Sequence, residues 1–168
     1  MSDTISIMRD GCIVQTGTPA ELYDAPVSRY VADFVGESNF FAGVVSEADS
    51  THATIRTETG MVLRAPYPRG GKRLNKDQDG VIAVRPEVIL MWAATEADPP
   101  TVDVSVRGRI TNRIYLGHQA EFSVVTDQLG EMLVRTPKTA EAVSLDLAAG
   151  NEVFVGWQWN VGLALMDE

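Results

Sequence analysis

Two oppositely charged side chains flank a proline in the segment Val84-Arg85-Pro86-Glu87. The proline ring disfavours the helical region for the residue before it, so Arg85 is expected to be extended. An arginine and a carboxylate placed on either side of such a corner can form a charge-assisted hydrogen bond that fastens a strand crossing. The same two side chains can instead contact a ligand or a partner. Both interpretations of Arg85 and Glu87 stay open, a structural corner and a regulatory or interface site.

Two tryptophans occur close together in the segment Gly156-Trp157-Gln158-Trp159. Successive side chains of a β-strand point to opposite faces, so Trp157 and Trp159 are predicted to share a face. Large aromatic side chains on one face pack in a core or at a subunit interface, or they form a platform on which a base or another ring stacks.

The usual catalytic and metal-binding patterns are missing from this sequence. A Walker A loop needs G-x-x-x-x-G-K-[ST] to hold phosphates, and Gly70-Gly71-Lys72 lacks the first glycine and the hydroxyl residue. His52 and His118 have no cysteine or patterned carboxylate beside them, so they are predicted to be surface or structural histidines rather than metal ligands or catalysts. We therefore expect no enzymatic activity and no cofactor or metal for this chain alone.

The composition is that of a folded, acidic chain. Among 168 residues 45% are hydrophobic and the formal net charge is −9, which allows a core and opposes binding to nucleic-acid phosphates. No apolar run approaches the roughly 20 residues of a membrane helix, and the single cysteine, Cys12, cannot form an intramolecular disulfide. These features predict a cytoplasmic protein without direct membrane insertion. The one basic cluster is predicted to be a solvated loop, with a phosphate-binding patch as the alternative; it contains Arg64, Arg69, Lys72, Arg73 and Lys76.

The first 36 residues predict a hairpin and two short helices. Apolar and polar residues alternate before Asp10-Gly11, a dipeptide typical of tight hairpin turns, so residues 3–16 are expected to form a β-hairpin. Thr18-Pro19-Ala20-Glu21 has the form of a capping box and begins a helix that ends near Asp24. Beyond Pro26 a second helical stripe runs up to Gly36, formed by Val27, Tyr30, Val31, Phe34 and Val35.

After Gly36 the hydrophobic pattern changes to a period of two. About ten short runs rich in β-branched and aromatic residues, separated by turns that contain glycine or proline, predict a small barrel or sandwich. The predicted fold class is therefore mainly β, preceded by the hairpin and the two helices. The predicted core consists of Val44, Ile55, Val62, Ile82, Val84, Ile89, Val106, Ile110, Ile114, Phe122, Val124, Val134, Val153, Val155 and Leu163.

Two groups of motifs resemble one protein family. The stretch Asp10-Gly11-Cys12-Ile13-Val14-Gln15-Thr16-Gly17-Thr18-Pro19, followed by Val31-Ala32-Asp33-Phe34-Val35-Gly36, resembles the end of the nucleotide-binding domain in the ATPase subunits of ABC importers. The V-R-P-E motif at Val84–Glu87, the Tyr115-Leu116-Gly117 turn and the two tryptophans resemble the C-terminal TOBE, or transport-associated OB, region of that family. Ser38-Asn39-Phe40 is most similar to the subunits of the polyamine (spermidine/putrescine) type.

This resemblance implies a division of the chain and a set of partners. Residues 1–38 would be the end of the nucleotide-binding domain, and residues 39–168 an OB-like regulatory β-domain with two barrel-like halves. ATP and Mg²⁺ would be bound only by an upstream domain, which carries the Walker A, signature, Walker B and switch-histidine motifs. The family works as a pair of ATPase subunits at the inner face of the cell membrane, with membrane subunits as partners. Candidates for regulatory or interface contacts are Arg85, Glu87, Tyr115, Trp157 and Trp159.

The N-terminal hairpin of such a subunit packs on structure that precedes this chain. Because a hairpin alone is marginal, residues 1–36 are expected either to fold back onto the barrel or to pair with a second copy, with segment exchange as one route. We favour a homodimer, since Ile5, Ile7, Ile13 and Phe34 would otherwise face water. The predicted function is a regulatory and dimer-forming C-terminal domain of an importer ATPase for polyamines or a related small solute. The alternative is a free-standing OB-like domain that binds a small ligand or an oxyanion.

Overall fold

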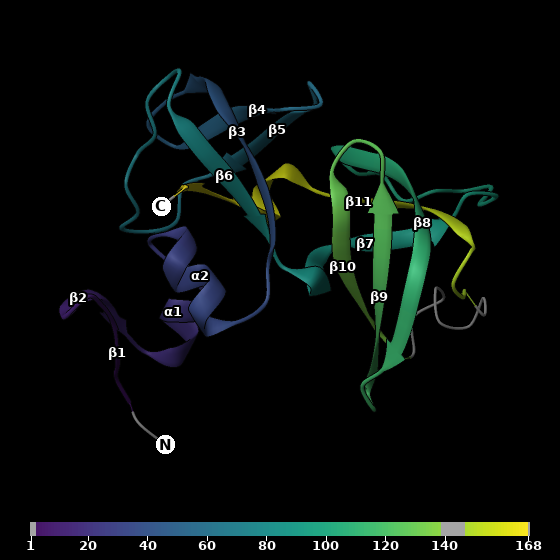
Figure 1. The fold of residues 1–168 in the computed structure, drawn as a ribbon, viewed down its shortest axis with the longest axis horizontal. Coiled ribbons are helices and arrows are strands. Elements are labelled where there is room, and N and C mark those ends of the chain that lie inside the picture. Colours follow the sequence, from purple (N-terminus) through teal and green to yellow (C-terminus); the bar gives the residue numbers. More distant parts are fainter. Residues whose placement is uncertain (1–2, 139–146, 168) are drawn as a thin grey trace. The chain divides into compact units, whose positions relative to one another are not determined.

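The chain folds into two compact units in a computed structural model that describes residues 3–138 and 147–167 (Figure 1). Unit 1 consists of Met1–Ala83 with Gly162–Glu168, and unit 2 consists of Val84–Val161. Each unit contains one curled five-stranded sheet, which confirms the predicted mainly-β class. The family resemblance places a domain boundary between residues 38 and 39. That boundary stays a prediction, since the two compact units divide the chain at other residues.

The N-terminal hairpin forms as predicted. β1 (Ile5–Arg9) pairs antiparallel with β2 (Cys12–Gly17). The turn residues Asp10 and Gly11 have φ angles of 52° and 79°. Positive φ at both central positions is the geometry of a primed hairpin turn, which glycine adopts without strain.

Two short helices follow the hairpin. α1 (Pro19–Asp24) begins with the predicted capping box, in which Glu21 N donates to Thr18 Oγ1 at 3.2 Å and Thr18 N donates to Glu21 Oε2 at 2.9 Å. The bonds from the Thr18 backbone and side chain hold the pKa of the Glu21 carboxyl below its ordinary value. α2 (Arg29–Val35) begins after Ser28, whose hydroxyl accepts a hydrogen bond from Val31 N.

The hairpin and the helices share a small apolar core. Ile7, Leu22 and Val31 are buried together. On α2, the neighbouring Ala32 packs with Val81, Ala83 and Leu165 of the sheet, and the Arg29 guanidinium pairs with the Asp167 carboxylate. Within residues 3–36, α2 therefore contacts the sheet of unit 1, which agrees with the fold-back alternative.

In the sheet of unit 1, β12 pairs antiparallel with β6, and β4 pairs antiparallel with both β3 and β5. The edge strand β12 comes from the end of the chain. The strand order of the sheet is β12-β6-β3-β4-β5, and β12 and β5 at its two edges contact each other. Four of the five residues of the predicted basic loop, Arg69, Lys72, Arg73 and Lys76, are exposed in the connection between β5 and β6, which the buried Pro68 and Leu74 anchor. Arg64 is also exposed but belongs to β5, so the loop prediction is wrong for this residue. The strands are β3 (Asn39–Ala48), β4 (His52–Thr57), β5 (Val62–Pro66), β6 (Asp79–Val84) and β12 (Leu163–Met166).

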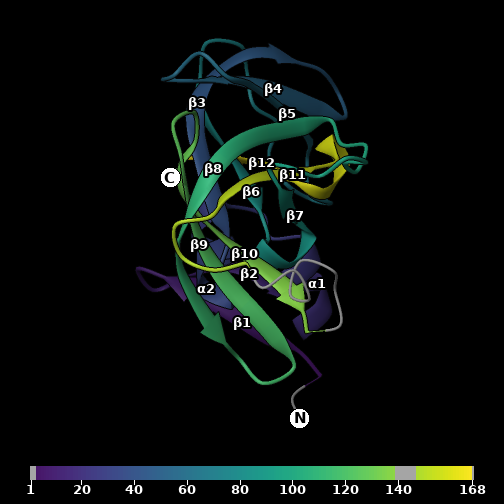
Figure 2. The same cartoon turned by 90° about the vertical axis from the view of Figure 1, so that its right-hand side faces the viewer.

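The sheet of unit 2 is antiparallel and has the order β10-β9-β8-β11-β7. Its long strand β8 bends along its length (Figure 2), and a β-bulge between Ile110 and Asn112 is the local cause. The edge strand β10 contacts both β7 and the short helix η1, so the sheet curls toward closure. The elements are η1 (Pro86–Val88), β7 (Leu90–Ala93), β8 (Val104–Tyr115), β9 (Gln119–Thr126), β10 (Gly130–Pro137), β11 (Glu152–Trp157) and η2 (Trp159–Val161).

Most of the predicted core is buried. Leu163 is half-buried and packs against the cluster of Ala32 and Leu165. Among residues 3–138 and 147–167 no helix is long and apolar enough to cross a membrane. The confirmed core residues are Ile55, Ile82, Val84, Ile89, Val106, Ile110, Phe122, Val124, Val134, Val153 and Val155.

Three predicted core residues are wrong. Val44 is 45% exposed and Val62 is 51% exposed, while the next residue in each strand, Val45 and Leu63, is buried. Neighbouring residues of a strand point to opposite faces. The prediction of a strand with a period of two was therefore right, but the face predicted to be buried was wrong at these two sites. Ile114 is 45% exposed because it follows the bulge in β8, where one extra residue exchanges the inward and outward positions.

Candidate functional site

Unit 2 contains a cavity of about 520 Å³ at the open edge of its curled sheet. β7 provides Leu90, Met91 and Trp92, and β10 provides Arg135 and Thr136. Glu87 of η1 and Ile89, just before β7, also line the cavity. The loop after β7 contributes Glu96, Asp98 and Pro100, and the end of β10 contributes Pro137. A cavity of this volume, apolar on several sides and with a few polar groups, has the size of a small-molecule site.

The charged groups of this cavity are mostly carboxylates. Glu87, Glu96 and Asp98 line it, against a single guanidinium from Arg135. Nε and Nη2 of Arg135 both lie 2.7 Å from Glu121 Oε2, and this pair is largely shielded from water, with side chains 20% and 14% exposed. The charge of Arg135 is therefore compensated by Glu121 within the sheet.

A buried hydroxyl in the cavity wall lacks a hydrogen-bond partner. Thr136 is 6% exposed, and within the described part of the chain its Oγ1 makes no hydrogen bond. A buried hydroxyl without a partner costs free energy, about 1–3 kcal/mol, and native proteins rarely retain one without a reason. The period-two pattern of β10 gives no sign of this group, because a threonine in a strand is ordinary.

The V-R-P-E segment lies beside this cavity. Arg85 has φ −70° and ψ 141°, the extended conformation predicted from the proline, and it precedes η1. Glu87, on η1, is exposed and lines the cavity, whereas Arg85 is half-buried outside its lining. The structure thus brings one predicted site residue to the cavity. Sequence reasoning missed Glu96, Asp98 and Thr136. The one available signal was the Pro99-Pro100 turn, which places the preceding Asp98 in a loop.

The remaining candidates of unit 2 lie apart. Trp157 ends β11 and is 1% exposed, whereas Trp159 begins η2 and is partly exposed. The prediction that the two tryptophans share a strand face is wrong, because the strand stops between them. Tyr115, at the end of β8, is 60% exposed, and the Arg113 guanidinium lies 4.6 Å from the centre of its ring. None of the three lines the cavity.

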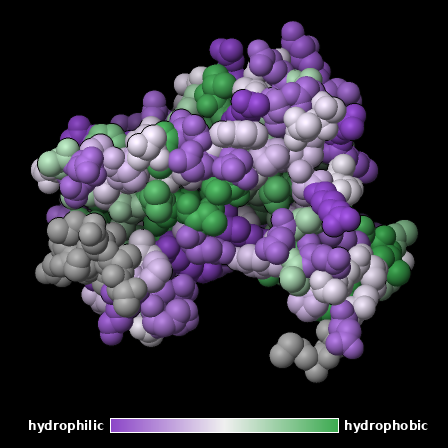
Figure 3. Space-filling model, turned by 180° about the vertical axis from the view of Figure 1, so that it is seen from behind, coloured by the Kyte–Doolittle hydropathy of each residue, from purple (hydrophilic) through white to green (hydrophobic). Residues whose placement is uncertain are grey.

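An apolar groove of about 440 Å³ marks the N-terminal hairpin and helices. Its lining includes Ile5, Leu22 and Phe34, and apolar surface gathers on this side of unit 1 (Figure 3). Ile13 and Phe34 are 63% and 66% exposed, as expected for an unpartnered face, but Ile7 is 2% exposed. Ile7 is therefore covered within the chain, and the expectation that it faces water was wrong, because Leu22 and Val31 pack over it.

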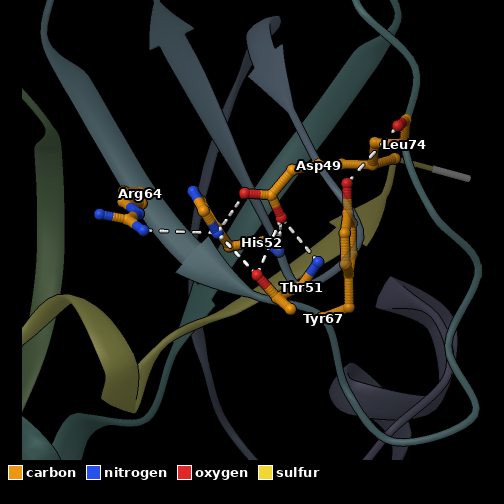
Figure 4. A network of polar contacts seen from close by, with 6 residues as sticks. All are labelled: Asp49, Thr51, His52, Arg64, Tyr67 and Leu74. Atoms are coloured by element: carbon orange, nitrogen blue, oxygen red, sulfur yellow. Dashed lines mark hydrogen bonds and ion pairs between the residues drawn. The ribbon is translucent and has the colours of Figure 1, made fainter.

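A cluster of polar side chains surrounds His52 (Figure 4). Asp49 Oδ1 accepts from the backbone N of Thr51 at 2.6 Å, from Thr51 Oγ1 at 2.8 Å and from His52 N at 2.9 Å. Asp49 Oδ2 and Thr51 Oγ1 both lie near His52 Nδ1, at 2.9 and 3.0 Å. In a catalytic triad the carboxylate and the nucleophile occupy different ring nitrogens, so this arrangement closes the β3–β4 turn and matches the structural interpretation of His52.

The carboxylate of Asp49 makes this turn sensitive to acid. The hydrogen bonds from the backbones of Thr51 and His52 lower its pKa from 3.8 to about 2. A depressed folded-state pKa adds stability that is fully present above 3.8 and is lost as the pH falls through about 2. We expect wild type to lose more stability than Asp49→Asn between these pH values, measured by urea unfolding. An Asp49 carboxyl resonance that titrates at its ordinary pKa would contradict this.

Metal binding has no obvious place in the part of the chain that the structure describes, which contains no group of three or more His, Cys, Asp and Glu side chains placed around one point. The fold defines an OB-like β-protein whose second unit contains a cavity. A family model described as the TOBE domain matches residues 82–165, half of the sequence. The chain belongs to the TOBE-domain family.

Similar proteins extend this match over nearly the whole chain. The spermidine/putrescine import ATP-binding protein PotA of Trichodesmium erythraeum is 31% identical over 99% of this chain and 43% of its own length. The Fe(3+) ions import ATP-binding protein FbpC of Rhizobium etli is 35% identical over 99% of this chain and 42% of its own length. The chain thus spans less than half of these relatives and matches their C-terminal part.

A solved structure supports the fold. The cytoplasmic molybdate-binding protein ModG superposes with a TM-score of 0.64 over 76% of this chain and 95% of its own, at 16% identity. At this identity the likeness concerns the architecture alone.

Proposed function

We propose that this chain is the regulatory and dimer-forming C-terminal part of the ATP-hydrolysing subunit of an ABC importer for polyamines or a related small solute. The observation that carries the proposal is the alignment with ATP-binding import proteins over 99% of the chain, hairpin and helices included, beyond the residues of the TOBE match. The exposed apolar groove near Phe34 supports it, since this face would pack on the upstream ATP-binding domain or on a second copy. The proposed location is the inner face of the membrane, through the transporter's membrane subunits.

The substrate is the finer part of this proposal. Relatives named for spermidine/putrescine and for Fe(3+) import match the chain about equally well. Ser38-Asn39-Phe40 favours the polyamine type, by the resemblance described above.

The alternative is a free-standing domain that binds a small ligand or an oxyanion, and the described side chains give the oxyanion little support. The cavity of unit 2 is acidic. A second, polar pocket contains Arg107 and Arg109, but Arg107 is hydrogen-bonded to the Glu152 carboxylate and lowers the pKa of that group. Arginines already compensated in this way attract an anion weakly.

A chimaera tests the importer proposal. The full 168-residue chain replaces the C-terminal part of Trichodesmium PotA to which it aligns. We expect Mg²⁺-dependent ATP hydrolysis and import of spermidine in cells that lack the native subunit, and no phosphate release from the chain alone. A folded chimaera that hydrolyses ATP but restores no import would contradict the proposal, as would chelator-sensitive phosphate release by the isolated chain.

Light scattering tests the dimer. We expect the full chain to have twice the 18.3 kDa mass of one copy, and Ile13→Asp or Phe34→Asp to give the single mass, because a charge on the apolar face opposes burial. Val62→Asp, at a valine of the sheet that is 51% exposed, is the control and should leave the dimer intact. A monomeric wild type whose residues 3–16 exchange amide hydrogen freely would overturn the dimer.

A further inference from the structure

The end of β5 and the connection from β5 to β6 carry a concentrated positive charge on an acidic protein. Residues 64–76 contain five basic side chains and no carboxylate. The other 155 residues carry 9 of the 14 basic side chains and all 23 acidic ones. All five basic residues are exposed. We call them the basic patch, which consists of Arg64, Arg69, Lys72, Arg73 and Lys76.

The backbone that carries this patch is held in place. Gly71 N donates to the Pro68 carbonyl oxygen at 2.9 Å, and Gly70 has a φ angle of 76°, which closes a tight turn. Pro68 and Leu74 are buried, and the Tyr67 hydroxyl reaches the Leu74 carbonyl oxygen at 3.5 Å (Figure 4). A loop fixed in this way presents its charges with little loss of backbone entropy on binding.

Part of this charge is not compensated within the described chain. Arg73 and Lys76 form no ion pair with the carboxylates of residues 3–138 and 147–167. Arg69 differs, because the Thr18 hydrogen bonds and, to a smaller extent, the charge of Arg69 hold the pKa of the Glu21 carboxyl below its ordinary value. The patch therefore keeps cationic groups that an external anion can approach.

Protection of a sheet edge does not explain the patch. β5 lies at one edge of its sheet, and charged side chains on an edge strand oppose pairing with another sheet. Of the five residues only Arg64 belongs to β5, and the other four follow the end of the strand at Pro66.

The placement of the charges favours a short acidic polypeptide over other anions. A small anion needs donors that converge in one cavity, and no residue of the patch lines the three cavities described above. A nucleic acid or an anionic membrane extends well beyond one Debye length, about 8 Å at physiological salt, and would meet the acidic remainder of the chain. A short run of carboxylates can pair with the patch and stay clear of that remainder.

We propose that the basic patch is a docking site for an acidic segment of a partner protein, whose carboxylates pair with Lys72, Arg73 and Lys76. Exposed ion pairs are individually weak, so several carboxylates must bind together and the contact depends on salt. The patch belongs to unit 1, and the proposal does not depend on the importer function.

Titration of the full chain with the peptide hexaglutamate, followed by NMR, tests this site. We expect a dissociation constant on the order of 1 mM at about 20 mM NaCl and no detectable binding at about 500 mM, because salt screens exposed charges. The amide resonances of Gly70 and Gly71 should shift during the titration. That of Gly130, at the start of β10 in unit 2, should not.

Two matched lysines separate the patch from the net charge of the protein. Lys76→Gln should weaken binding about threefold, and Arg73→Gln combined with Lys76→Gln about tenfold. Lys138→Gln removes the same charge from an exposed site of unit 2 and should leave the dissociation constant unchanged.

Four results would overturn the proposal. They are no binding of hexaglutamate at low salt, equal weakening by Lys76→Gln and Lys138→Gln, and tighter binding of inorganic phosphate or of a thymidine oligonucleotide with six phosphates than of hexaglutamate. The fourth is loss of a dimer in light scattering on Arg73→Gln combined with Lys76→Gln, which would assign the patch to contacts between copies. The chimaera's ATP hydrolysis and import remain a separate readout, so failure of this site and failure of the importer proposal are distinguishable.

Discussion

Val124→Asp is expected to lower the free energy of unfolding by about 3 kcal/mol or more. Val124 lies in the middle of β9 and is fully buried. Its strand neighbours across the sheet are Ile110 on β8 and Met132 on β10, which are also buried. A carboxylate at this position loses its hydration and gains no opposite charge, so it must stay neutral or disrupt the sheet of unit 2.

The adjacent residue provides a matched control. Val125 points to the other face of β9, is 43% exposed and lies opposite Arg109. Val125→Asp should change the unfolding free energy by no more than about 0.5 kcal/mol. Urea unfolding followed by circular dichroism measures both variants. Equal losses at the two positions would show that the face assignment of β9 is wrong.

Local signals predicted the N-terminal segment well. Asp10-Gly11 predicts a turn with positive φ, and Thr18 with Glu21 predicts a helix start, because each pattern satisfies backbone groups within a few residues. The structure has both features. What these signals could not give is the tertiary environment of Ile7, which is buried by residues of α1 and α2 rather than by a second copy.

The strand errors have a different origin. Val44 is followed by the apolar Val45, and Val62 by the apolar Leu63, so the sequence allows either residue of each pair to be the buried one. Only packing against other strands decides which of the two is buried. At Ile114 the bulge in β8 exchanges the faces, so Arg113 takes the position opposite the buried Phe122 and its Nη1 donates to the Leu147 carbonyl at 2.6 Å. A bulge of this kind leaves no residue signature that the alternating pattern could reveal.

The cavity could be predicted only in part. The V-R-P-E motif predicted Glu87 as a site residue. Thr136 lies on a strand far along the chain, and it lines the same cavity as Glu87 only because β10 contacts η1. Trp157, a candidate interface residue from its type, contributes to the core because β11 lies between β7 and β8. Distant segments become neighbours through sheet order, which a single sequence does not specify.

Gly156→Ala is expected to destabilise the chain by about 3 kcal/mol, at the upper end of what overpacking costs. Gly156 is the next-to-last residue of β11 and is paired with Ser105 of β8 and Leu90 of β7. A Cβ atom there would lie 2.3 Å from the Val104 carbonyl oxygen and 2.9 Å from Val102 Cγ2. Backbone cannot rotate out of the way as a side chain does, so the strands must separate and weaken their hydrogen bonds.

Gly17→Ala is the control for this substitution. At Gly17 the nearest atom to a new Cβ is Glu21 Oε2 at 3.1 Å, which must shift slightly within the capping box, and the change should cost no more than about 1 kcal/mol. Chemical unfolding of both variants measures the difference. The Cβ at Gly156 would also lie 3.1 Å from Trp92 Cη2, so the same variant should shift the Trp92 indole resonance. A stable Gly156→Ala protein with an unshifted Trp92 signal would mean that β8 and β11 are not as close at this position as the structure has them.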